Sequence, residues 1–137
     1  MARYRGKTFT LIWITALSMW LTGCAGVQVK SKHNQLQNTL NAYQTAVRWG
    51  NLADMYAFLE PERKLEAEIP AHLENLRVTR YEELGSPVIV DDVATVTARI
   101  SYVHQDRQVE RVIQDRQEWR HEPGVGWLRS NPIPEMP

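Results

Sequence analysis

Polar and ionisable side chains occupy positions of this sequence where a strand should face the core. Strand alternation places six side chains on one face: Val109, Arg111, Ile113, Asp115, Gln117 and Trp119. Tyr102 and His104 occupy core positions of the preceding strand and would border the same space. Because a charge held away from water needs a partner, these residues predict a polar pocket for a small ligand. In such a pocket His104 or Asp115 could act as a general base.

Two other arrangements would account for the same pattern. A bulge between Val112 and Gln117 would turn Arg111, Asp115 and Gln117 toward water. A wide sheet face that the helices leave uncovered would solvate the same side chains. The sequence leaves the pocket and both alternatives open.

Other reactive residue types lack the spacing that their chemistry requires. The four histidines, His33, His72, His104 and His121, show no metal-ligand spacing and have no partner cysteine. Ser86 and Ser101 lack the flanking glycines of a nucleophile elbow. The chain has 16 basic and 16 acidic residues, so no basic excess indicates a nucleic-acid surface. We therefore expect no metal, no cofactor and no nucleic-acid partner.

The elements that would position these residues begin with helices. Apolar residues recur at helical spacing over residues 34–49 and predict a helix with one apolar face: Leu36, Leu40, Tyr43 and Val47. Gly50 suits the end of that helix, and Asn51 can cap a second helix over residues 52–59. Another short helical turn is expected around Pro70.

After Leu76 the apolar period changes from helical to strand-like. Two short strands are expected within residues 78–90, with an interruption at Gly85-Ser86-Pro87. A long strand over residues 93–104 and a returning strand over 109–121 follow, joined by a polar hairpin loop over 105–108. A glycine turn then leads into a last strand that begins at Trp127.

Helices grouped before antiparallel strands predict an α+β fold, with the N-terminal helices packed on one face of a curved antiparallel sheet. The stretches "VDDVATVTARISYV" and "EWRHEPGVGWLRS" resemble the long hairpin and the closing strands of NTF2-like or SnoaL-like domains. This resemblance spans about residues 34–130 and implies a cone with a pocket between helices and sheet. A cystatin-like fold, with one helix across such a sheet, is the competing prediction.

The first residues have the pattern of a secretory signal peptide. Arg3, Arg5 and Lys7 precede a largely apolar stretch over residues 8–21. Tyr4 separates the two arginines, so the twin-arginine export signal is missing. The apolar stretch is shorter than the roughly 20 residues that a membrane-spanning helix needs. An uncleaved membrane anchor stays open as an alternative, because no charge follows before Lys30.

The end of that apolar stretch, Leu21-Thr22-Gly23-Cys24, resembles the lipobox of bacterial lipoproteins. The resemblance implies cleavage between Gly23 and Cys24, a diacylglyceryl group on the Cys24 sulfur, and fatty acylation of the new amino terminus. The other interpretation is a lone cysteine that packs as a small hydrophobe. Ala25 follows where lipoproteins retained in the inner membrane tend to have Asp, so the implied location is the outer membrane, facing the periplasm.

The sequence thus predicts four parts: a signal peptide over residues 1–23, a lipid-anchored tether over 24–33, an α+β domain over 34–131 and a proline-rich tail over 132–137. The tether has no helical period, and the tail cannot continue a sheet ladder.

The expected role is that of a membrane-anchored envelope protein with a non-catalytic domain, which binds an envelope protein or a small apolar ligand. Some NTF2-like relatives are isomerases or dehydratases, but none of their motifs matches positions of this chain, so no catalytic residue is carried over. A pocketed enzyme of that kind and an assembly factor for an envelope complex are the alternatives.

Overall fold

The structure is a computed structural model of the chain and describes residues 24–107 and 109–137, without the side chains of residues 24–28. The predicted signal peptide and the Cys24 side chain lie outside the described residues. The chain divides into two units, Met1–Asn34 and Gln35–Pro137. The sheet and its core belong to the second unit.

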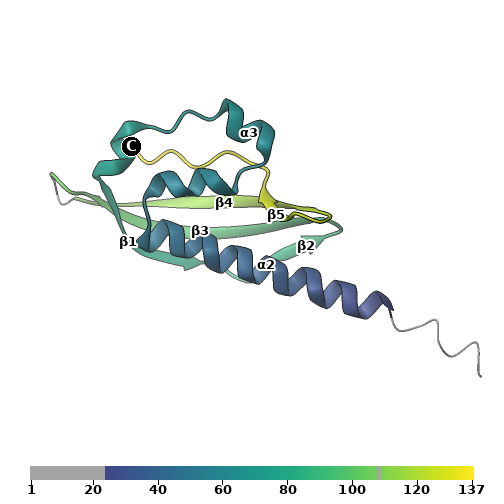
Figure 1. Cartoon of the computed structure of the whole chain (residues 1–137). Helices are drawn as coiled ribbons and strands as arrows, with labels where there is room; N and C mark the ends of the chain where they lie inside the picture. Colours follow the sequence, from purple (N-terminus) through teal and green to yellow (C-terminus); the bar gives the residue numbers. More distant parts are fainter. Residues whose placement is uncertain (1–23, 108) are drawn as a thin grey trace, which may run out of the picture. The chain divides into compact units, whose positions relative to one another are not determined.

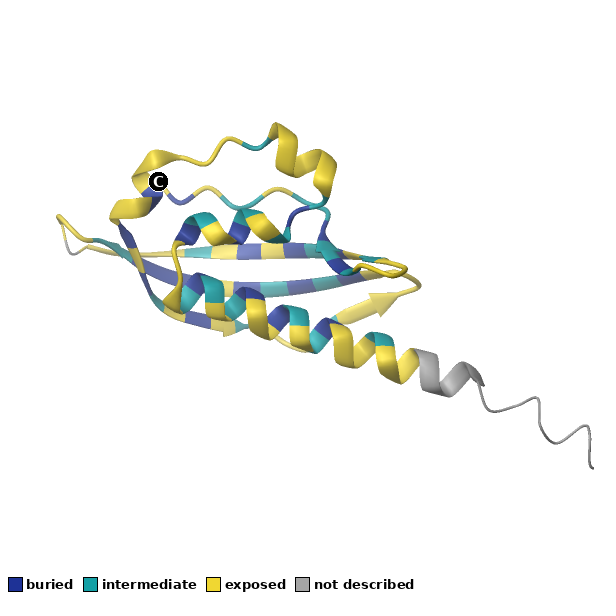
Figure 2. Ribbon diagram, in the orientation of Figure 1, coloured by how far each residue is buried: buried dark blue, intermediate teal, exposed yellow. Residues whose placement is uncertain are grey.

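Helix α2 spans Cys24–Trp49. From Gln35 onward its predicted apolar stripe is buried (Figure 2). The helix ends at Gly50 as predicted: the Gly50 amide donates to the Ala46 carbonyl at 3.0 Å, and a Cβ on Gly50 would lie 2.8 Å from that oxygen. The stretch over 24–33, predicted to lack helical structure, is helical from Cys24, because extending a helix that is already nucleated costs little. Its role as a tether stays a prediction.

Three short helical segments connect α2 to the sheet: η2 (Leu52–Phe58), α3 (Pro61–Glu66) and η3 (Ala71–Asn75). Asn51 caps η2 as predicted, since its side-chain oxygen accepts the Ala53 amide while Asp54 accepts the Asn51 amide. Figure 1 shows the connection that carries α3 running alongside the last coil of the chain.

Five strands form one antiparallel sheet: β1 (Leu76–Glu83), β2 (Val88–Val90), β3 (Val93–His104), β4 (Glu110–Glu122) and β5 (Gly126–Arg129). The order is β1-β3-β4-β5, and β2 pairs with β3 next to β1. Strands β3 and β4 pair without a register shift, from Val93 opposite Arg120 to Val103 opposite Glu110. The bulge considered within β4 is therefore absent, and the structure has an irregularity in β1 instead, between Val78 and Arg80.

The predicted fold class is confirmed. The molecule is α+β, with α2 packed on a strongly curled antiparallel sheet in a manner consistent with an NTF2-like cone (Figure 1). The inner face of β3 is apolar and buried, and it consists of Ala94, Val96, Ala98, Ile100 and Tyr102. Within the described residues, no helix combines the length and the hydropathy that a membrane crossing requires.

Trp119 on β4 closes the core and is fully buried, whereas Trp49 at the end of α2 is 77% exposed. We expect Trp119→Ala to lower the free energy of unfolding by about 3 to 5 kcal/mol, because the substitution leaves a large cavity. Urea unfolding followed by circular dichroism measures this loss. Trp49→Ala is the matched control and should change stability by less than about 0.5 kcal/mol. Equal effects of the two substitutions would contradict the burial of Trp119.

Candidate functional site

A buried ion pair lies at the centre of the core. Asp115 comes from the middle of β4 and Arg129 from the end of β5, and both side chains are at most 1% exposed. Arg129 donates two parallel hydrogen bonds to the Asp115 carboxylate, from Nη1 to Oδ2 at 2.9 Å and from Nη2 to Oδ1 at 2.6 Å. This two-pronged geometry suits a planar guanidinium and offsets part of the cost of removing both charges from water.

Every N–H group of Arg129 has an acceptor. Besides the two bonds to Asp115, Nη1 donates to the Tyr43 hydroxyl at 2.5 Å, Nη2 to the Pro132 carbonyl at 2.9 Å, and Nε to the Asn131 carbonyl at 3.3 Å. A guanidinium has five N–H donors, and all five are used here. Arg129 is therefore committed to holding its neighbours in place.

Gln117 extends the network along β4. Its amide nitrogen donates to the Asp115 carboxylate at 2.9 Å and to the Tyr81 hydroxyl at 2.8 Å, and its amide oxygen accepts the Trp119 indole N–H at 3.1 Å. The Gln117 side chain is fully buried. Both ends of the amide are thus satisfied, which is the condition for keeping a polar side chain in a core.

Burial shifts the pKa values of three residues in the network, Tyr43, Tyr81 and Arg129. It raises the pKa of Tyr43 well above its usual value, and the Arg129 charge offsets only part of that rise. The pKa of Tyr81 is also raised, and burial is the largest cause. For Arg129, burial lowers the pKa, but the hydrogen bonds to Asp115 and the neighbouring charges outweigh it, so the pKa is raised. The tyrosines stay neutral and the arginine stays charged at neutral pH.

The residues predicted to line a pocket fall into two groups. Asp115 and Gln117 point into the core as strand alternation indicated, but other side chains use their polar atoms. Tyr102, His104 and Arg111 converge on a single atom, the main-chain oxygen of Pro137, at 3.0, 3.2 and 2.8 Å. Of these three, Tyr102 is buried, His104 is half-buried and Arg111 is exposed.

The residues over 132–137, predicted as a tail outside the domain, pack against it. Met136 is buried in the core and Ile133 packs against it. His72 Nε2 lies 3.0 Å from the Met136 carbonyl oxygen, and since a carbonyl only accepts, the proton resides on Nε2. The Asn131 side chain bonds the β4 edge at both its ends: Oδ1 accepts the Glu118 amide at 2.9 Å and Nδ2 donates to the Arg116 carbonyl at 2.6 Å.

Clefts flank this last segment. One of about 360 Å³ lies between it and the α3 connection, with Tyr56, Leu59 and Pro70 in its wall. A second of about 290 Å³ is lined by His72, Leu73 and residues 133–137. Both clefts therefore lie between the segment and the connection that carries η2, α3 and η3.

Sequence reasoning missed Arg129, Tyr43 and Tyr81 as members of the network. A signal for Arg129 was present, because it is two residues from Trp127 and so shares its face on a strand. Tyr43 and Tyr81 follow the apolar pattern of their elements. That pattern indicates burial of the rings but does not indicate which groups their hydroxyls bond.

The arrangement is built for support and not for proton transfer at Asp115. Both carboxylate oxygens accept hydrogen bonds, and the side chain is closed to water. Within the described part of the chain, no group of three His, Cys, Asp or Glu side chains is placed to hold a metal ion. No family model, curated protein or solved structure matches this chain.

Replacing Asp115 by Asn should lower the free energy of unfolding by about 3 to 5 kcal/mol, because it leaves the Arg129 charge buried without a counter-ion. The matched control is Glu82→Gln, which removes the exposed Glu82–Arg99 pair at 3.3 Å and should cost less than about 1 kcal/mol. Urea unfolding at pH 7 measures both. A loss in Asp115→Asn no larger than in the control would show that the ion pair does not hold the core.

Alkaline pH should destabilise the fold through the buried tyrosines. Above about pH 10 the unfolded chain releases tyrosine protons that folded Tyr43 and Tyr81 retain, so the free energy of unfolding falls as pH rises. Urea unfolding between pH 8 and pH 11.5, roughly spanning the usual tyrosine pKa, measures the slope. Tyr81→Phe should make that slope shallower. An unchanged slope in this variant would contradict the raised pKa of Tyr81.

Proposed function

We propose that this chain is a bacterial lipoprotein, anchored through Cys24, whose domain binds a protein partner or a small apolar ligand in the cell envelope. One sequence observation carries the anchoring: Leu21-Thr22-Gly23-Cys24 ends an apolar stretch that follows three basic residues. A small residue at each of the two positions before the cysteine is what cleavage there requires. The proposed location is the outer membrane, facing the periplasm, on the strength of Ala25.

The position of the cysteine also suits its proposed chemistry. One acyl chain holds a protein at a membrane only marginally, at about 0.8 kcal/mol per buried methylene, whereas two or three chains on one residue give stable anchoring. A diacylglyceryl thioether together with an acylated amino terminus supplies three chains on Cys24.

The chemistry of the core supports a binding role over a catalytic one. Asp115 was a candidate base in the enzyme alternative, and its oxygens are occupied by Arg129, Gln117 and Tyr43. His104, the other candidate, directs Nε2 at the Pro137 oxygen. Clefts along the surface of the domain, in contrast, offer room for a partner's side chains.

The anchor can be tested by Cys24→Ala in the full chain. We expect an uncleaved precursor that carries no lipid, because cleavage follows transfer of lipid to the sulfur in the proposed route. Labelling cells with a fatty-acid analogue and weighing the purified protein by mass spectrometry report the outcome. Thr22→Ser keeps a small residue in the lipobox and is the control, expected to be processed normally. A membrane-retained product of mature mass from Cys24→Ala would refute the anchor.

The binding role can be tested separately by native mass spectrometry of the full chain extracted from its own host's membranes. A retained small-molecule mass would favour a carrier of apolar ligands. A bare chain that photo-crosslinks reproducibly to one envelope protein in intact cells would favour an interaction module. Neither a retained mass nor a crosslink would refute the binding role while leaving the anchor intact.

A further inference from the structure

The segment that follows β5, Asn131–Pro137, is held by a set of side chains that recognise its main chain. Six hydrogen bonds reach four of its main-chain oxygens: Arg129 to Asn131 and Pro132, His72 to Met136, and Tyr102, His104 and Arg111 to Pro137. The six donor atoms belong to five side chains of the domain. The groove that they form is therefore lined with donors, and we call it the segment groove.

A groove lined with hydrogen-bond donors suits a ligand that contains prolines. Three of the seven residues in the segment are prolines, which have no N–H to donate. An extended chain of this kind offers mainly carbonyl oxygens and apolar rings, and grooves with aromatic walls and donors are how such segments are bound elsewhere. Here Tyr56 and Tyr102 supply aromatic rings beside the segment, and the buried Met136 side chain is its one deep anchor.

Much of the segment is only partly covered by the domain. Pro132, Glu135 and Pro137 are exposed, and Ile133 and Pro134 are only half-buried. The clefts of about 360 and 290 Å³ lie directly along the segment. No strand ladder includes residues beyond Arg129, so residues 133–137 can leave without breaking the sheet. The Asn131 and Pro132 carbonyls then stay in place as acceptors for Arg129.

We propose that the segment groove is the binding site for an extended, proline-containing segment of a partner protein, and that Asn131–Pro137 occupies it in the free state. This inference rests on the proposed binding role and names the class of partner. The ligand carries an apolar side chain at the position of Met136 and presents its next main-chain oxygen to Tyr102, His104 and Arg111. Competition by the attached segment keeps the groove closed until a partner is present at sufficient local concentration.

The test uses the full chain in detergent micelles and a fluorescent synthetic peptide with the sequence of residues 131–137. Met136→Ala in the chain removes the anchor of the resident segment, so the peptide should bind this variant at least tenfold more tightly than the wild-type chain, measured by fluorescence anisotropy. A peptide with Ala at the Met136 position should bind the same variant at least tenfold more weakly. A folded Met136→Ala chain that binds the peptide no better than wild type would overturn the proposal.

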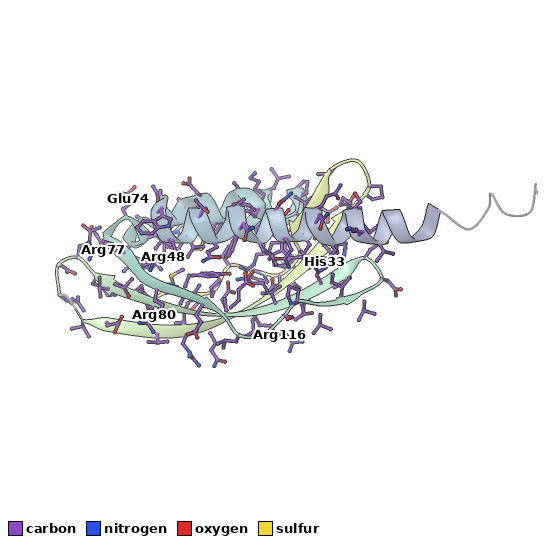
Figure 3. All side chains as sticks on the ribbon, turned by 90° about the horizontal axis from the view of Figure 1, so that it is seen from below. His33, Arg48, Glu74, Arg77, Arg80 and Arg116 are labelled. Atoms are coloured by element: carbon purple, nitrogen blue, oxygen red, sulfur yellow. The ribbon has the colours of Figure 1, made fainter. Side chains whose placement is uncertain are left out.

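Two arginines on β4 provide a matched pair of secondary variants. In the Met136→Ala background, Arg111→Ala should weaken peptide binding at least tenfold. Arg116→Ala should leave it unchanged, because Arg116 pairs with Thr97 on the outer side of the sheet, away from α2 (Figure 3). Equal effects of the two substitutions would overturn the assignment of the groove.

A second variant covers the case in which Met136→Ala does not fold. Pro134→Gly leaves the anchor in place and increases the freedom of the released segment. The resident segment then competes less well, so the added peptide should bind at least threefold more tightly.

The other possible occupant of the segment groove is the same segment of a second copy of the chain, and analytical ultracentrifugation of the wild-type chain tests it. A dimer that is lost in Met136→Ala would assign the groove to a second copy and overturn the partner assignment. Peptide binding does not involve Cys24, so failure here with normal processing and crosslinking refutes the groove alone.

Discussion

The buried guanidinium of Arg129 constrains the packing of the residues around it. Without water, it needs acceptors for its five N–H groups and a negatively charged partner. Its acceptors come from three parts of the domain: Asp115 on β4, Tyr43 on α2, and the carbonyl groups of Asn131 and Pro132 in the segment after β5. The main-chain oxygen of Arg129 also accepts the Glu60 amide at 3.0 Å, which ties the start of α3 to β5. Helix, sheet and segment are thus positioned by one side chain.

Aromatic rings isolate this charge from water. Tyr43 contacts Phe58 and Trp119 edge to face, each with ring centroids 5.3 Å apart. In such surroundings hydrogen bonds are strong and an unpaired polar atom is costly, so alternative packings of the helix on the sheet are penalised. We infer that the network contributes to the uniqueness of the fold more than to its net stability, since buried ion pairs roughly balance their own desolvation.

The sequence predicted those features that depend on local periodicity. The limits of β3, the end of α2 at Gly50 and the inward direction of Asp115 and Gln117 all follow from spacing along one element. The partner of Asp115 did not follow, because pairing with Arg129 requires the β4–β5 register. Arg111 shares a strand face with Asp115 but is exposed, since it lies near the end of β4, where alternation no longer implies burial. The prolines after β5 excluded a strand and carried no information on whether the segment packs.

The distance along the chain between Tyr43 and Arg129, 86 residues, has a consequence for the order of folding. A chain that emerges amino terminus first presents α2 long before β5 exists, and Asp115 likewise waits for its counter-ion. Contacts this far apart in sequence form late, because closing the intervening loop must precede any gain from them. The core is therefore completed only after β5, the last strand of the sheet, has emerged.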